Sequence, residues 1–420
     1  MEKENWKYIL INGKFKQIEV KNPVYEKGVL TSIDDLKPFD EKDDEGKRKK
    51  PNLQNANSLK RSIYTEFFKK PFKNLLIFSG AGSSMDVGGL SMTQLWTKAQ
   101  EQYKIGNVDG FKIIQDAVNF KSDKIEIEGL LSQIDGFCKF AGDSEITINK
   151  EKKKLSAIKD ELFELIKINC TIEKPKNNFP HKVFLEKLLQ RKQTSPRVKV
   201  FTLNYDLLFE YAATEVNAIV IDGFSFTIPR TFSGRFFGYD IVQREGSKLK
   251  EEDNFIPRVF HLHKLHGSLN WERDESDKKV RIKDKPKKPL IIYPREAKYE
   301  DSYEQPFFEM MARFQRNLRL NNDTMLICVG YSFNDKHINA AIEEALNQNP
   351  GFRLAIIDPG FDDDKVSHSL TVIKKEALES ERILMVSETF TDFAKHFPEI
   401  KTYENDNYIT INLKDEQPKN

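Results

Sequence analysis

From about residue 57 onward, the chain alternates short apolar runs with stretches of helical periodicity. The apolar runs lie at residues 74–80, 198–203, 218–221, 258–265, 289–293, 324–330, 352–358 and 382–386. A helix is predicted before the first run, at residues 58–69, and helices follow several others, at residues 205–213, 303–318 and 335–347. Continuous apolar strands that alternate with helices are typical of a parallel sheet covered on both faces. The pattern therefore predicts an α/β fold.

Two stretches depart from this alternation. Between about residues 92 and 193, apolar residues recur at spacings of three and four without a strong strand, which predicts an inserted helical subdomain. Residues 6–30 alternate polar and apolar positions and predict a hairpin, whereas residues 36–56 are too polar to bury a face. We therefore expect an N-terminal extension (1–56), an α/β domain with the insert (57–400) and a C-terminal tail (401–420).

Composition and charge narrow the class of protein. The chain has 420 residues, and 67 Lys and Arg against 65 Asp and Glu leave a net charge of +2. No overall field favours nucleic acid or a membrane surface, so we predict neither partner. The sequence shows no apolar signal segment and no apolar run near the roughly 20 residues of a membrane span, so we expect a cytoplasmic protein. Its three scattered cysteines, Cys138, Cys170 and Cys328, exclude a four-cysteine zinc site.

A glycine-rich turn follows the first strand, with the sequence Gly80-Ala81-Gly82-Ser83-Ser84. Glycines at a strand end let the backbone turn tightly and approach a pyrophosphate, whose charge backbone amides accept. The turn lacks the third glycine of the GxGxxG fingerprint, where Met85 stands. A plain structural turn is therefore an equal alternative.

The next strong strand ends in Thr202-Leu203-Asn204-Tyr205-Asp206. In an open parallel sheet, ligands bind outside the carboxyl ends of the strands. Asn204 and Asp206 are therefore candidates for a site. The alternative is that either residue only caps the helix that begins there.

Three histidines follow in the sequence HLHKLHG, which spans residues 261–267. Strand alternation places His261 and His263 on one face, whereas His266 falls at the strand end before a glycine. His266 is thus a candidate general base at the mouth of the sheet. A metal site would need a third ligand that the sequence does not supply, so we predict no metal.

Two later strands also end in polar turns. The first continues as GYSFND from Gly330, where Ser332 is suited to bond a phosphate or ribose, and Asn334 or Asp335 to cap the next helix. The second ends in Asp358-Pro359-Gly360. A carboxylate at that place often holds ribose hydroxyls, although Asp-Pro-Gly is also an ordinary turn.

In this order, the five motifs resemble those of the sirtuin-like (silent-information-regulator-two) superfamily, and are most similar to its prokaryotic anti-phage branch, whose members hydrolyse NAD. The resemblance spans about residues 70–360. It implies a Rossmann-like parallel sheet, NAD as the substrate, and Asn204 and His266 as catalytic residues. It also implies that NAD is bound by Gly80, Ala81, Gly82, Ser83, Ser84, Asp206, Gly330, Ser332 and Asp358.

The sequence also departs from the deacetylase sirtuins. Those proteins continue the glycine turn with Gly-Ile-Pro-Asp-Phe-Arg, whereas residues 88–93 here read Gly-Gly-Leu-Ser-Met-Thr. They also carry a four-cysteine zinc module, which this chain cannot build. Both departures disfavour acetyl-lysine chemistry and fit the hydrolase branch, so the resemblance implies an NAD glycohydrolase that depletes NAD in abortive-infection defence. The alternatives are an NAD-dependent protein deacylase, a non-enzymatic NAD or ADP-ribose sensor and, disfavoured by the incomplete fingerprint, a dehydrogenase.

The resemblance has implications for assembly as well. It implies a homo-oligomer, and in some members a complex with a HerA-like ATPase. We expect the helical insert and the N-terminal segment to make these contacts.

Overall fold

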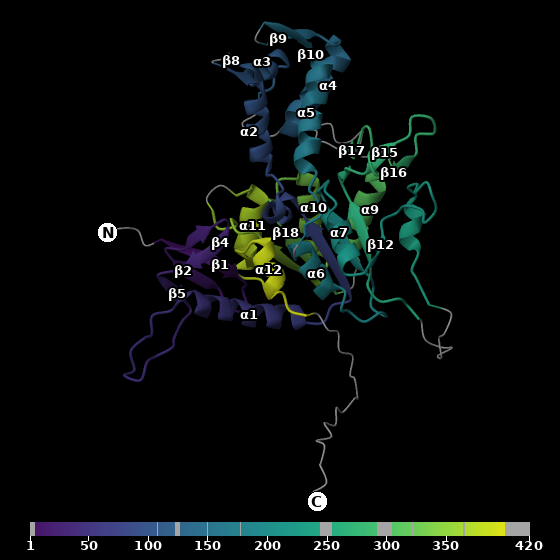
Figure 1. Ribbon diagram of the computed structural model, residues 1–420. Coiled ribbons are helices and arrows are strands. Elements are labelled where there is room, and N and C mark those ends of the chain that lie inside the picture. The colour runs from purple at the N-terminus through teal and green to yellow at the C-terminus, as the bar shows by residue number, and fades with distance from the viewer. Residues whose placement is uncertain are drawn as a thin grey trace, which may run out of the picture.

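The computed structural model describes residues 5–106, 108–121, 127–148, 150–176, 178–243, 254–291, 305–320, 323–363 and 366–399. Its centre is a ten-stranded sheet in the order β12-β13-β11-β6-β18-β19-β20-β1-β2-β5 (Figure 1). Neighbouring strands from β12 to β20 pair in parallel. The predicted α/β fold with a parallel sheet is confirmed.

The parallel strands coincide with the predicted apolar runs. They are β6 (Asn74–Ser79), β11 (Val198–Thr202), β12 (Ile219–Ile221), β13 (Val259–Lys264), β18 (Thr324–Val329), β19 (Phe352–Ile357) and β20 (Ile383–Val386). Every residue of β6, β18 and β19 is buried, as expected for strands covered on both faces.

The strand predicted at residues 289–293 is not part of this sheet. Within the described residues it forms only β17 (Leu290–Ile291), which pairs antiparallel with β14 (Gly267–Ser268). Residues 292 and 293 lie outside the described ranges, as do the start of the helix predicted from residue 303 and the predicted tail at 401–420. The charged stretch at 272–288 contains a hairpin of β15 (Trp271–Arg273) and β16 (Val280–Ile282).

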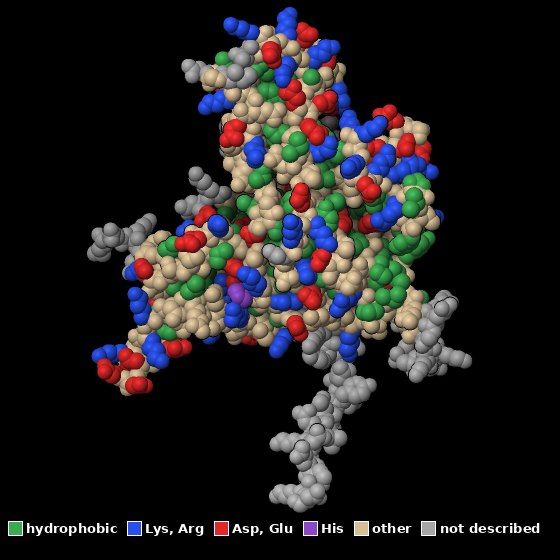
Figure 2. Space-filling model, in the orientation of Figure 1, with side chains coloured by type: hydrophobic (Ala, Val, Ile, Leu, Met, Phe, Trp, Pro, Cys, Tyr) green, Lys and Arg blue, Asp and Glu red, His purple; other side chains and the backbone are tan. Residues whose placement is uncertain are grey.

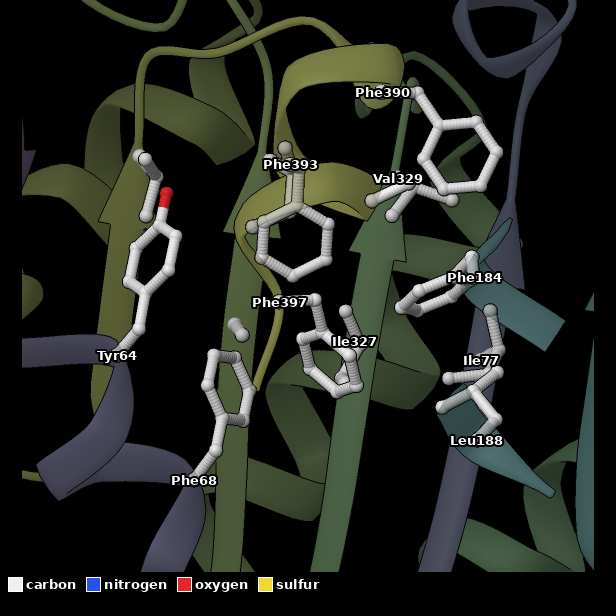
Figure 3. Close-up of a cluster of buried hydrophobic side chains, with 14 of the residues drawn as sticks. Tyr64, Phe68, Ile77, Phe184, Leu188, Ile327, Val329, Phe390, Phe393 and Phe397 are labelled. Atoms are coloured by element: carbon white, nitrogen blue, oxygen red, sulfur yellow. The ribbon is translucent and has the colours of Figure 1, made fainter. Parts of the chain in front are cut away.

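Helices cover both faces of the sheet. One face packs against α1 (Leu53–Lys69), α6 (Pro180–Leu188), α7 (Leu208–Glu215) and α12 (Phe390–His396). Figure 3 shows aromatic rings from α1, α6 and α12 packed together. Phe397, which directly follows α12, has its ring centroid 5.0 Å from that of Phe68. The other face packs against α9 (Phe307–Leu318), α10 (Lys336–Gln348) and α11 (His368–Ala377).

The N-terminal segment extends the sheet. Strand β1 (Trp6–Ile11) pairs antiparallel with β20, and β2 (Ile18–Lys21) and β5 (Asp35–Lys37) follow it to the edge. Strands β3 (Val24–Glu26) and β4 (Val29–Ser32) form a separate hairpin. The predicted polar loop also ends earlier than expected, because α1 begins at Leu53 rather than at residue 58. Asn52 and Asn55 there exchange side-chain and backbone hydrogen bonds in a capping box.

A helical projection with its own hydrophobic core rises from the sheet (Figure 1). It contains α2 (Met92–Tyr103), α3 (Gly110–Ala117), α4 (Ile127–Ala141) and α5 (Leu155–Cys170), and we call it the insert. Two short hairpins interrupt the helices where no strong strand was expected: β7 (Lys104–Ile105) with β8 (Val108–Asp109), and β9 (Glu145–Ile148) with β10 (Glu151–Lys154). Helix α6 lies within residues 92–193 but packs on the sheet instead.

The surface mixes charges of both signs. Figure 2 shows basic and acidic side chains side by side over the visible face. None of the helices in the described ranges has the length and apolar character needed to cross a bilayer.

Candidate functional site at the carboxyl edge of the sheet

Two glycine turns interlock at the carboxyl ends of β6 and β18. The Gly82 amide donates to the Gly330 carbonyl oxygen at 2.9 Å, and the Gly80 amide donates to that of Val329 at 3.1 Å. A Cβ atom on Gly82 would lie 2.7 Å from the Gly330 Cα, and one on Gly330 would lie 2.2 Å from the Ser83 nitrogen. Gly330 also has a φ of +60°, which favours glycine. The packing of the two turns therefore itself requires glycine at these positions.

The backbone amides of this turn differ in their partners. Those of Gly80, Gly82, Ser83 and Ser84 donate to carbonyl oxygens of the chain. The amide of Ala81 donates to no backbone carbonyl in the described ranges, and Ala81 is exposed. Ala81 is thus the position in the turn whose amide is available to an anion.

Asn204 follows β11 and reaches into the glycine turn. Its Nδ2 lies 3.0 Å from the Gly80 carbonyl oxygen, 3.1 Å from Ser83 Oγ and 2.9 Å from Ser84 Oγ. The backbone amide of Asn204 donates to Thr202 Oγ1 at 3.0 Å. The side-chain nitrogen is therefore held toward the turn. The side-chain oxygen, Oδ1, is left to accept hydrogen bonds from other groups.

Asp206 belongs to the same cluster. Ser84 Oγ donates to Asp206 Oδ2 at 2.7 Å, and the Leu208 amide donates to Oδ1 at 3.1 Å. Asp206 is 8% exposed, so both bonds are shielded from water. The second bond satisfies an amide at the start of α7. The carboxylate therefore bonds both the glycine turn and the start of α7.

His266 lies two residues beyond the end of β13 and is partly buried, with 15% of its side chain exposed. Its Nε2 is 3.8 Å from Asp335 Oδ2. The other oxygen of Asp335 caps α10, because Oδ1 accepts from the amides of His337 and Ile338. The sequence indicated only this capping role for Asp335. Within the described ranges, no three His, Cys, Asp or Glu side chains are grouped so as to hold a metal ion.

The other two histidines of this segment lie in the core. His263 is 1% exposed and stacks between Phe201 and Phe237, with ring centroids 4.5 and 4.2 Å away. His261 also contacts Phe237, so the two histidines share one face, as the alternation predicted. Burial lowers the pKa of His261 to about 4 and the pKa of His263 well below its usual value. Both side chains are therefore neutral at neutral pH.

Ser332 and Asp358 lie at the ends of β18 and β19. Ser332 is exposed, and its Oγ accepts from Asn334 Nδ2 at 3.1 Å. Asp358 Oδ1 accepts from the Gly360 amide at 2.8 Å, and burial raises the pKa of Asp358. These bonds run within each residue's own turn. Among the described residues, neither side chain therefore joins the Asn204 cluster through a hydrogen bond.

Sequence reasoning missed Lys264 and Glu210, whose Nζ and Oε1 atoms are 3.0 Å apart behind this cluster. A signal was present in the sequence. Strand alternation places Lys264 on the same face as Phe260 and Leu262, and a charged residue in a buried apolar row requires a polar partner.

A hollow of about 800 Å³ lies at the opposite, amino edge of the sheet. Its lining includes Arg191, Arg258 and Glu399, from segments that precede β11 and β13 or follow α12. None of the predicted site residues contributes to it. The candidate site therefore rests on the polar cluster at the carboxyl edge.

Residues 198–381 match the SIR2-like domain family. The matched region is less than half of the chain and begins at β11, so it contains Asn204, His266 and Gly330 but not the glycine turn after β6. A sirtuin-like domain in this chain is thereby supported.

Solved structures and curated proteins give two further results. A structure described as a mutant of a Sir2 homologue in complex with ADP ribose is similar, with 14% sequence identity and a TM-score of 0.39. The similarity covers 80% of this chain and 95% of that one. No curated protein matches the chain.

Proposed function

We propose that this protein is an NAD glycohydrolase, which cleaves the bond between nicotinamide and ribose and releases nicotinamide and ADP-ribose. The observation that carries the proposal is the Asn204 amide, bonded into the glycine turn at the sheet edge where His266 and Asp335 also lie. The SIR2-like match over this region supports an NAD-related activity.

The chemistry of the bond sets what the site must supply. Cleavage of a ribosyl bond passes through an oxocarbenium-like state. Nicotinamide leaves as a neutral ring, so the leaving group needs no strong general acid. Water then adds to the ribose carbon and loses one proton. The site must therefore position water and accept that proton.

The side chains of the cluster suit these roles. Asn204 holds its nitrogen in the turn, which leaves its Oδ1 to accept a hydrogen bond from a ribose hydroxyl or from the attacking water. His266 takes the proton, and Asp335 Oδ2 at 3.8 Å stabilises the resulting imidazolium. In this proposal the Ala81 amide donates to a phosphate, while Ser332 and Asp358 hold NAD further along the edge.

A product assay tests the proposal against its rivals. The purified protein is incubated with NAD, with or without an acetylated peptide, and nicotinamide, ADP-ribose and peptide are separated by chromatography. Nicotinamide and ADP-ribose in equal amounts without peptide are expected. Nicotinamide release that requires the peptide would indicate a deacylase instead. Intact NAD despite measurable NAD binding would indicate a sensor.

We also propose that the activity depletes NAD during anti-phage defence, in a homo-oligomer or together with a HerA-like ATPase. Cells that express the wild-type protein should lose NAD after infection, whereas cells that express Asn204→Ala should not. Equal NAD levels in both would contradict this role.

A further inference from the structure

Lys264, the last residue of β13, is a charged side chain in an apolar layer. It is 2% exposed and lies on the face of the strand that packs against α7. A buried ammonium group is costly unless hydrogen-bond acceptors satisfy it. The acceptors around Lys264 therefore show which segments of the chain this residue connects.

Two of these acceptors are backbone carbonyls of the loop after β11. Lys264 Nζ donates to the carbonyl oxygen of Asp206 and, at 3.4 Å, to that of Tyr205. Its third acceptor is Glu210 Oε1 on α7, at 3.0 Å. The three donors of an ammonium group are thus matched by three acceptors, two of which flank the site.

The same loop is joined to the His266 segment by backbone bonds. The Leu265 amide donates to the Thr202 carbonyl at 2.8 Å, and the Leu269 amide donates to that of Tyr205 at 3.1 Å. Lys264 adds the side-chain link between these two bonds. It lies two residues before His266 and binds the loop one and two residues after Asn204.

We propose that Lys264 is a positioning residue, which fixes the loop bearing Asn204 and Asp206 against the segment bearing His266. The inference rests on the proposed hydrolase function, because it assigns Lys264 to the geometry of that reaction. Lys264 touches none of the reacting atoms. Loss of its bonds lets the two catalytic side chains move relative to each other, and small misplacements of such groups are expensive in rate.

Glu210 has a separate role as the counterion. Burial raises the pKa of Glu210, and the adjacent Lys264 opposes that shift. Its second oxygen, Oε2, is buried with no hydrogen-bond partner among the described residues. Removal of Lys264 alone would therefore leave an uncompensated carboxylate. The experiment must separate this effect from the effect of losing the bonds to the loop.

The chain offers a matched control at the other edge of the sheet. Arg353 in β19 is 8% exposed, and its guanidinium also donates to backbone carbonyls, those of Phe67, Lys70 and Pro71. These carbonyls lie at the end of α1 and not in the candidate site. Arg353→Met thus removes a buried cation from backbone carbonyls without touching the Asn204 loop.

The test compares Lys264→Met, Lys264→Met/Glu210→Gln and Arg353→Met in the full chain. The melting temperature, the kcat and KM for NAD, and the hydrogen exchange of backbone amides at residues 202–208 are measured. Lys264→Met should lower kcat at least tenfold with a smaller change in KM, and should speed exchange in this segment. The double variant should have a higher melting temperature than Lys264→Met, because Glu210→Gln removes the uncompensated carboxylate. Its kcat should stay low, because the bonds from Lys264 to the loop are still absent. Arg353→Met should have a lower melting temperature than the wild-type protein. Its kcat and the slow hydrogen exchange of backbone amides at residues 202–208 should be unchanged.

Recovery of kcat in the double variant would overturn the proposal, since Lys264 would then act only as a counterion. Unchanged exchange at 202–208 in both Lys264 variants would overturn it as well. If Lys264→Met does not fold, the double variant gives both readouts. If the wild-type protein leaves NAD intact, the hydrolase function fails. The exchange comparison still decides whether Lys264 holds the loop.

Discussion

A buried cation lies at each edge of the parallel sheet. At the carboxyl edge, Lys264 donates to the carbonyls of Tyr205 and Asp206, in the loop that begins with Asn204. At the amino edge, Arg353 donates to carbonyls at the end of α1, those of Phe67, Lys70 and Pro71. The two groups use the same kind of bond, a charged donor to backbone oxygens in an apolar layer.

What differs is the segment that each cation holds. Arg353 satisfies carbonyls that a helix end leaves unpaired, which stabilises the join between α1 and the sheet. Lys264 holds a loop whose side chains converge on the glycine turn after β6. If the proposed function holds, we expect changes at the amino edge to alter the free energy of unfolding, and changes at the carboxyl edge to alter NAD turnover first.

The largest effect should come from Asn204→Ala. We expect NAD turnover to fall by about a hundredfold or more, because the group that orients water or the ribose hydroxyl is lost. The melting temperature should change little, since Asn204 is only partly buried. Asn317→Ala is a control, because Asn317 donates to the Arg313 carbonyl within α9. Equal loss of turnover in both variants would show that Asn204 has no special role in the reaction.

Tyr205→Ala should affect stability and activity together. Tyr205 is 7% exposed and packs in the hydrophobic core of the insert, although its neighbours in sequence are Asn204 and Asp206. Loss of a buried aromatic ring costs about 3–5 kcal/mol, and here it also releases the loop. Tyr103→Ala removes a ring from the same core away from the loop. Urea unfolding and NAD turnover should show lower stability in both variants but lower turnover only for Tyr205→Ala.

The buried histidines predict a pH dependence of stability. His261 and His263 are neutral in the fold, with the pKa of His261 lowered to about 4, whereas the unfolded chain takes up protons below about pH 6.5. The stability that comes from keeping these two histidines neutral is therefore fully present above pH 6.5, and it is lost as the pH falls toward 4. Each such histidine contributes a slope of at most about 1.4 kcal/mol per pH unit. Urea unfolding between pH 7 and 5 should show a shallower slope for His263→Phe, and equal slopes would contradict neutral burial.

The smallest effect is expected from metal chelation. In the described ranges no group of three potential ligands is assembled, and the three cysteines are scattered. EDTA should change neither the melting temperature nor NAD turnover. Loss of either property and its restoration by zinc would instead show that the protein has a metal site.

The sequence predicted the parallel strands well, because strands buried on both faces are continuous apolar runs. It could not predict that β1 joins the sheet beside β20, since an alternating pattern identifies a strand but not its distant partner. The pattern also predicted a strand at 289–293, but it could not show that the described part of it, β17, pairs with β14 outside the main sheet.

The sequence pointed to some of the side chains that meet at the carboxyl edge, but not to the contacts that join them. Strand ends with glycine and polar residues located Asn204 and Asp206, which the structure joins to the glycine turn. The interlock of Gly82 with Gly330 had no local signal, because either turn alone also fits a ligand-binding turn. Lys264 had a signal, a charge in an apolar strand face, but the residues of its motif that indicate chemistry are the histidines.

Two histidines that lie three residues apart, His263 and His266, allow the proposed hydrolysis to be tested directly. NAD cleavage is measured as nicotinamide release by the wild-type protein, by His266→Ala and by His263→Phe, at neutral pH and with folding verified by thermal unfolding. We expect the wild-type protein and His263→Phe to cleave NAD, and His266→Ala to be slower by about a hundredfold or more. Normal cleavage by His266→Ala, or intact NAD with the wild-type protein under every activating condition, would contradict it.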